Sequence, residues 1–230
     1  MAKATSERYF GDDFFGFLTE LRVHNNREWF MQNKHRYENS VRDPFLRLIA
    51  DLAPALKKIP PGFVADPRPM GGSMMRIYRD IRFSKDKSPY KISVAAHFSI
   101  HNSKADVPAL YLHLEPGQSA IGGGAWHPEP APLKYIRDAI VAHPKRWQQA
   151  ISGKEFRSSC GMFGDSLKRP PVGYPPDHPL IEDIKRKDFA ISSPLSDDEV
   201  CGKGLMELIV EKYRITSPFV QFLCDAVKAA

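Results

Sequence analysis

Apolar positions follow a helical period at both ends of the chain and a strand period between them. The first helix carries an apolar face formed by Phe14, Phe17, Leu18 and Leu21. A second helix begins near Arg27 and breaks or restarts at Asp43-Pro44, because proline fits only the first turn of a helix. Later helices are predicted at 133–141, around Trp147, at 180–187 and from 197 to 227.

The residues from Met74 to about Ile121 show no helical period, and we expect them to form consecutive strands. Apolar and polar residues alternate over 92–100 and again over 110–115, which predicts a hairpin. One face of this hairpin is predicted to pack against helices through Leu110, Leu112 and Leu114. The opposite face is predicted to carry polar side chains, namely His97, Tyr111, His113 and Glu115.

Helices on both sides of a run of strands are typical of an α+β fold. We therefore predict a single domain over 1–230 with a mainly antiparallel sheet, and with N- and C-terminal helices packed on one face. A chain of 230 residues with 42% hydrophobic content is long enough to bury such a core. The segment 156–179 is rich in Gly, Pro, Ser and Lys, and we expect a long irregular excursion there.

The segment from Arg76 to Lys91 is the most unusual part of the chain and reads R-I-Y-R-D-I-R-F-S-K-D-K-S-P-Y-K. A period of two predicts that its first half is a strand with one side formed by Met75, Ile77, Ile81 and Phe83. The other side is predicted to present Arg76, Tyr78, Asp80 and Arg82. Guanidinium groups bind phosphates and carboxylates bidentately, so this side indicates an anion site. The alternative is a salt-bridged outer strand in which Asp80 neutralises its arginines.

A third strand, S-A-I-G-G-G-A-W-H-P, is predicted to place Gly122 and Gly124 beside the face that carries His113. Glycines inside a strand usually mark a bulge or the close approach of a ligand or another backbone. We therefore expect a polar floor with small walls. Trp126, at the end of this strand, is expected to close over the core.

The net charge of +6 and the pI of about 9.2 favour anionic partners, nucleic acid included. Three cysteines at wide spacing predict neither a disulfide framework nor a C-x-x-C metal pair. The N-terminus has no apolar run of signal-peptide length, and no apolar stretch reaches the roughly 18 residues of a membrane span. We expect a cytoplasmic protein with no membrane partner.

Acid–base or electrostatic catalysis is the chemistry that these residues favour, because the chain has no nucleophile elbow, Walker loop, dinucleotide fingerprint or H-E-x-x-H motif. The predicted catalytic residues are His113, Glu115 and Asp80. The predicted ligand-binding residues are Arg76, Tyr78, Arg79, Arg82, Lys85, Lys87, Tyr90, Tyr111, Gly122, Gly124, Lys168 and Arg169. A metal would need His97 or Asp80 as a third ligand, so we predict none. The residues name no cofactor and no oligomeric state.

Five segments of the chain have a distinctive sequence. They are the run from Arg76 to Tyr90, N-N-R-E-W-F at 25–30, Y-L-H-L-E-P-G at 111–117, G-G-G-A-W-H-P-E-P at 122–130 and K-R-P-P-V-G-Y-P-P-D-H-P at 168–179. In these segments the chain resembles the bacterial domain of unknown function 2461 family. The resemblance extends over nearly the whole chain and implies a single-domain soluble protein of about this length. It implies no activity, because the family has none established.

Three hypotheses follow for the function. The leading one is recognition of a phosphate- or carboxylate-bearing ligand on the Arg/His/Glu-lined sheet face, with hydrolytic or transfer chemistry as an extension. The second is a non-catalytic module that binds nucleic acid or an acidic protein, which would use splayed cations including Lys168, Arg169 and 185–187. The third is that the arginine segment is purely structural, as a buried salt-bridge lattice that sets strand register.

Overall fold

Within residues 8–103 and 108–228, which the computed structural model describes, five strands form one antiparallel sheet in the order β1-β2-β3-β5-β4. The strands are β1 (Val94–Phe98), β2 (Ala109–Leu114), β3 (Ala120–Ala125), β4 (Gly161–Phe163) and β5 (Phe189–Pro194). The helices are α1 (Asp13–Val23), α2 (Arg27–Gln32), α3 (Lys34–Arg36), the π-helix η1 (Tyr37–Arg42), α4 (Asp43–Leu56), α5 (Pro130–Ala142), α6 (Pro144–Ser152), α7 (Lys154–Ser159), α8 (Ile181–Ile184), α9 (Asp197–Cys201) and α10 (Leu205–Lys228). Residues 1–7, for which we expected no signal peptide, lie outside the described ranges. Part of the polar loop expected between the two strands of the hairpin, residues 104–107, also lies outside them.

The predicted α+β fold is confirmed: this is a single domain with an antiparallel sheet and helices at both ends. The hairpin of β1 and β2 has the expected register, in which His97 lies opposite Tyr111 and Ala96 lies opposite Leu112. Because side chains alternate between the two faces, the leucines of β2 point into the core and are fully buried. Tyr111 and His113 point to the opposite face and are half-buried.

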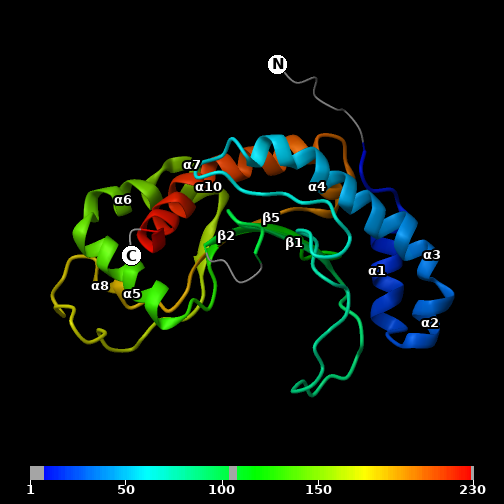
Figure 1. Ribbon diagram of the computed structural model, residues 1–230, viewed down its shortest axis with the longest axis horizontal. Coiled ribbons are helices and arrows are strands. Elements are labelled where there is room, and N and C mark those ends of the chain that lie inside the picture. Colours follow the sequence, from blue (N-terminus) through cyan, green and yellow to red (C-terminus); the bar gives the residue numbers. More distant parts are fainter. Residues whose placement is uncertain (1–7, 104–107, 229–230) are drawn as a thin grey trace.

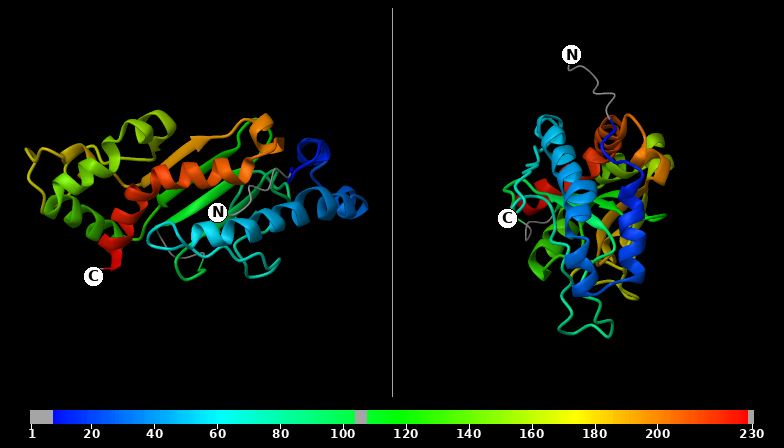
Figure 2. Two further views of the ribbon diagram at one scale, coloured as in Figure 1. Left: turned by 90° about the horizontal axis from the view of Figure 1, so that it is seen from above. Right: turned by 90° about the vertical axis from the view of Figure 1, so that its right-hand side faces the viewer.

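The long helices α4 and α10 lie across one face of the sheet, as Figures 1 and 2 show. A side chain at Gly123 of β3 would collide with Val220 of α10, so the absence of one lets the helix approach the strand. The Tyr213 hydroxyl of α10 donates to the carbonyl oxygen of Tyr111 at 2.8 Å. The other face of the sheet has no long helix across it and is called the open face below (Figure 1).

The N-terminal helices form an extension beside the sheet (Figure 1). Asn26 caps α2 by accepting from the backbone N–H of Trp29 at 2.9 Å. The expected break at Asp43-Pro44 is a change of helix type, because η1 runs directly into α4. Pro44 lies in the first turn of α4, and because η1 precedes it without a break, its missing N–H leaves the junction one backbone hydrogen bond short.

The prediction that the strands begin at Met74 is wrong for residues 76–93, which are in no strand. The backbone of 73–75 still pairs with β1, since Met75 N donates to Ala95 O and His97 N donates to Ser73 O. Beyond it, Tyr78 and Tyr90 form an isolated antiparallel bridge, and the chain between them projects from the sheet on its open side (Figure 1). Residues 76–91 are called the arm.

Two aspartates explain why the arm leaves the sheet. The Asp80 carboxylate accepts from the backbone N–H of Arg82, and the Asp86 carboxylate accepts from that of Ser88. Asp side chains that bind the backbone two residues on bend the chain and replace strand pairing. Phe83, predicted on the apolar side of a strand, is therefore 95% exposed.

At the sheet edge formed by β4, opposite the β1 edge, the segment 156–179 is only partly irregular. It contains the end of α7 and the short strand β4, which pairs with β5. From Gly164 to Leu180 the described chain has no helix or strand, only a bridge between Ser166 and Arg186. In the described part of the chain, no helix is long and apolar enough to cross a membrane.

Candidate ligand-binding site on the open sheet face

A cavity of about 490 Å³ lies on the open face and is called the hollow below. Its walls come from all five strands and from Met75 and Trp126 beside them, and they are mainly apolar. The residues that line it are Met75, His97, Ala109, Tyr111, Gly122, Gly123, Gly124, Trp126, Phe163, Ala190 and Ile191. Volumes of this size are typical of small-molecule sites.

The hollow exists because β3 carries glycines where other strands carry side chains. Gly122 lies opposite Tyr111 in the register, and a Cβ on Gly122 would come within 3.0 Å of the Ile191 carbonyl oxygen. Gly124 has a φ of +117°, and a Cβ there would overlap the carbonyl of Phe189. The small residues predicted as walls, Gly122 and Gly124, therefore form the floor of the hollow with their backbone.

Two exposed aromatic rings border the hollow. Trp126 follows β3 and is 47% exposed, so the expectation that it closes over the core is wrong. Phe163 ends β4 and is 44% exposed, and the two ring centroids lie 5.0 Å apart. Ligand pockets are lined mainly by apolar and aromatic side chains, and these two rings give the edge of the hollow that character. This pair is called the aromatic pair below.

A buried carboxylate holds the aromatic pair in place. Asp188, just before β5, is 1% exposed and accepts from the backbone N–H of His127 and of Asp165, each at 2.9 Å. His127 follows Trp126, and Asp165 lies two residues after Phe163. The His127 ring also approaches Asp188, with Nδ1 at 3.2 Å from Oδ1. Asp188 therefore joins the two loops that carry the rings.

His113 of β2 and Glu115, the residue after β2, meet beside Tyr111 at the hollow. His113 Nε2 lies 3.0 Å from Glu115 Oε2, and the Arg22 guanidinium of α1 lies 3.3 Å from Oε1 of the same carboxylate. The rings of Tyr111 and His113 stack with centroids 6.2 Å apart. The dyad could exchange a proton with a ligand bound beside Tyr111.

Asp80 is not part of this dyad. Its described contacts are with Arg82 on the arm, where Arg82 Nη2 lies 2.7 Å from Asp80 Oδ2. The pair is solvent-exposed, at 76% for Arg82 and 60% for Asp80, so the expectation of a buried salt-bridge lattice is wrong. The hydrogen bond from the Arg82 side chain lowers the pKa of Asp80 to about 2.

The predicted ligand-binding residues fall into several places. Tyr111, Gly122 and Gly124 line the hollow. Tyr78, Arg79 and Tyr90 line a different cavity at the base of the arm. The expectation that the arginine segment shares a sheet face with Tyr111 is wrong, because the arm carries these side chains away from the sheet. The exposed cations are Arg76, Arg82, Lys85 and Lys87 on the arm, and Lys168 and Arg169 on the segment 164–180.

The arm and the segment 164–180 stand on either side of the open face (Figure 1). The site residues predicted from the sequence did not include Trp126, Phe163 or Asp188. The available signals were the glycine run just before Trp126 and the single aspartate just before β5. Among the described residues, no group of three His, Cys, Asp or Glu side chains could hold a metal ion.

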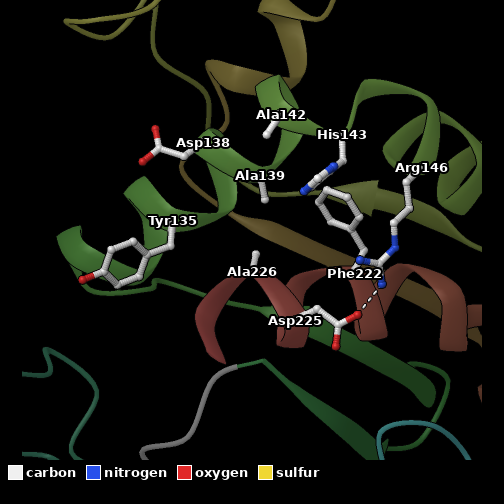
Figure 3. A pocket seen from close by; sticks show the side chains of 9 residues that line it. All are labelled: Tyr135, Asp138, Ala139, Ala142, His143, Arg146, Phe222, Asp225 and Ala226. Atoms are coloured by element: carbon white, nitrogen blue, oxygen red, sulfur yellow. Dashed lines mark hydrogen bonds and ion pairs between the residues drawn. The ribbon is translucent and has the colours of Figure 1, made fainter. Parts of the chain in front are cut away.

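Another cavity, of about 350 Å³, lies between α5, α6 and α10 (Figure 3). Its charged side chains already have partners. Arg146 pairs with Asp225, and Asp138 accepts from the Tyr174 hydroxyl at 2.7 Å and from Lys134 at 2.6 Å. Matched charges leave little attraction for an ionic ligand, so we place the candidate site in the hollow.

A family model described as conserved hypothetical protein (DUF2461) matches residues 13–222. The match includes the arm, the hollow and the aromatic pair, and the chain belongs to this family. No curated protein and no solved structure matches the chain.

Proposed function

We propose that this member of the DUF2461 family binds a ligand that combines a flat ring with phosphate groups. The ring lies in the hollow against the aromatic pair, and cations of the arm contact the phosphates. The observation that carries the proposal is the pair of exposed rings, Trp126 and Phe163, at the edge of a glycine-floored cavity.

A flat ring suits the hollow because its floor is backbone and its edge is aromatic. Stacking of a nucleic-acid base on an aromatic side chain contributes about 1–3 kcal/mol. The polar groups at the hollow are few, chiefly the Tyr111 hydroxyl and the His97 ring. Sites of this kind use a small number of polar groups to orient a mostly apolar contact.

Phosphates suit the arm because it begins at the wall of the hollow. Met75 lines the hollow, and Arg76 is the next residue. Arg82, Lys85 and Lys87 follow on the same projecting chain and are exposed. Exposed cations attract phosphates through a field that salt screens, so binding should weaken as salt is added.

A single strand of nucleic acid is a second candidate that a specific observation favours. The cations are spread along the arm and, across the open face, at Lys168 and Arg169, instead of converging on one point. Aromatic platforms combined with basic grooves are typical of proteins that bind single strands. Proton transfer by His113 and Glu115 would add hydrolytic or transfer chemistry to either ligand.

Fluorescence of the tryptophans tests the proposal. Adenosine monophosphate, adenosine and a short oligothymidylate are titrated into the wild type, Trp126→Phe and the control Trp29→Phe. We expect ligand-dependent quenching in the wild type and the control and its loss in Trp126→Phe, because Trp147 is buried and away from the hollow. Tighter binding of the oligomer than of the monophosphate favours the single strand.

The arm is tested with Arg76→Ala and Arg82→Ala in the same titrations. Loss of a charge-assisted contact should weaken binding by about 1.5–3 kcal/mol. Equal affinity in all three proteins would mean that the arm does not bind these ligands. Its arginines would then have a structural role or bind an acidic protein. Quenching that survives in Trp126→Phe would overturn the proposal.

A further inference from the structure

The arm and α2 enclose a separate cavity of about 460 Å³, called the arm-base cavity below. It shares no lining residue with the hollow. Its walls are Arg27 and Met31 of α2, and Tyr78, Arg79, Ile81, Pro89 and Tyr90 of the arm. Two guanidinium groups and two phenol hydroxyls line it, and no carboxylate does.

Several of these donors are available to a ligand. Arg27 makes no hydrogen bond or ion pair with any described residue, and neither phenol hydroxyl of Tyr78 and Tyr90 makes a hydrogen bond within that part of the chain. Arg79 pairs with Asp86 through one nitrogen, Nη1. A guanidinium has five N–H donors, so Arg79 has others to offer.

The wall of the arm-base cavity is held rigidly. The Asn25 side chain donates to the Tyr90 carbonyl at 2.9 Å and accepts from the Tyr90 backbone N–H at 3.0 Å. The Tyr90 ring stacks on Phe30 with centroids 4.0 Å apart, and lies 5.4 Å from the Tyr78 ring. Burial raises the pKa of Tyr90, so its hydroxyl keeps its proton and acts as a donor at neutral pH.

We infer that the arm-base cavity binds the phosphate group of a phosphate monoester. The donors come from α2 and from both sides of the Tyr78–Tyr90 bridge, and several donors from separate segments suit the three terminal oxygens of a phosphate better than the two of a carboxylate. The uncompensated charge of Arg27 balances part of the charge of the phosphate. The rest of the volume, bounded by Met31, Ile81 and Pro89, accepts a small apolar group.

This inference does not rest on the function proposed for the hollow. It also gives a role to two segments that the sequence singled out, N-N-R-E-W-F and the arginine run, because both contribute walls of the same cavity. Arg82 and Phe83, which are exposed on the outer part of the arm, take no part in it.

Calorimetric titration with ethyl phosphate, which has no ring for the hollow, and with inorganic phosphate and acetate tests the inference in the wild type, Arg27→Met, Tyr78→Phe and the control Arg157→Met. We expect ethyl phosphate to bind more tightly than inorganic phosphate, and acetate to bind least. Arg27→Met should weaken ethyl phosphate about tenfold or more and Tyr78→Phe several-fold, while Arg157→Met, an exposed cation on α7 outside both cavities, leaves it unchanged. Arg27 and Tyr78 are exposed, so these variants should fold, which circular dichroism checks.

Three results would overturn the inference. They are no binding of ethyl phosphate at millimolar concentration, equal affinity in wild type and Arg27→Met, and a loss in Arg157→Met as large as that in Arg27→Met. Failure of the ring site would appear separately, as adenosine that does not quench Trp126 while ethyl phosphate still binds.

Discussion

The hollow and the arm carry similar alternating patterns in the sequence but have opposite structures. In β1 and β2 the alternate apolar residues are buried in the core. The pattern therefore predicts correctly which residues face each other across the two strands and which face of the sheet is open. In the arm Ile77 is still buried in the core, but farther out the same alternation has no layer beneath it, and Phe83 lies in solvent. A period of two therefore predicts which side chains share a face only where a second layer can bury one face.

The two regions also differ in what holds them. The rings at the hollow depend on a buried carboxylate, Asp188, whereas the outer arm depends on exposed ion pairs such as Asp80 with Arg82. Leaving a buried donor without its acceptor costs about 1–3 kcal/mol, whereas exposed ion pairs are typically worth about 0–1 kcal/mol. Removing the groups that hold each region should therefore have effects on stability that decrease from Asp188 at the hollow to Asp80 on the outer arm.

The largest loss is expected for Asp188→Ala. It leaves the backbone N–H groups of His127 and Asp165 without their acceptor, and we expect the free energy of unfolding to fall by about 3 kcal/mol. Urea denaturation measures it. The control is Asp165→Ala, whose exposed side chain should change stability by less than about 0.5 kcal/mol. Similar small losses in both variants would show that Asp188 does not hold the loops.

Asn25→Ala comes next, at about 2 kcal/mol, because two hydrogen bonds to the Tyr90 backbone are lost. The base of the arm should loosen at the same time. The Arg79 and Lys91 amides donate across the arm to the carbonyl oxygens of Pro89 and Ile77, and their hydrogen exchange should speed up. Unchanged exchange would mean that Asn25 does not anchor the arm.

Gly122→Ala should lower the free energy of unfolding by about 1 kcal/mol. Its larger effect should be on ligand binding in the hollow. The added Cβ meets the Ile191 carbonyl oxygen at 3.0 Å and occupies part of the floor. Gly161→Ala is the matched control on β4, because nothing lies within 4 Å of the Cβ position. We expect ring binding to be lost in the first variant only, as measured by tryptophan quenching. Equal binding in both would mean that the floor is not part of the site.

The smallest effect is expected for Asp80→Asn, whose melting temperature at pH 7 should match the wild type. A carboxylate with a pKa lowered to about 2 adds stability above its unfolded pKa of about 4, and that contribution disappears as the pH falls through about 2. Any difference between the two proteins should therefore be present at pH 7 and absent below pH 2. Thermal unfolding across this range checks it, and a large loss at pH 7 would restore a structural role for Asp80.

Much of the sheet could be predicted from the sequence, and little of the aromatic pair could. The leucines of β2 and the glycines of β3 indicate their own faces, because the period along a strand is local information. Trp126 and Phe163 come together only through the pairing of β3 and β4 with β5, and through Asp188, which the local pattern does not show. Aspartate is a common turn residue, so Asp80 and Asp86 could have predicted the turns in the arm. The alternation of apolar and polar residues around them instead predicted a strand.

Binding of a flat ring in the hollow should be visible at single residues. Its most direct test is the change in NMR chemical shift of the Trp126 indole N–H and the Gly122 amide on addition of adenosine monophosphate, compared with ribose 5-phosphate. We predict saturable shifts of both resonances with adenosine monophosphate, and none at these two positions with ribose 5-phosphate, which has no base. Equal shifts with the two compounds, or shifts confined to the arm, would contradict the account.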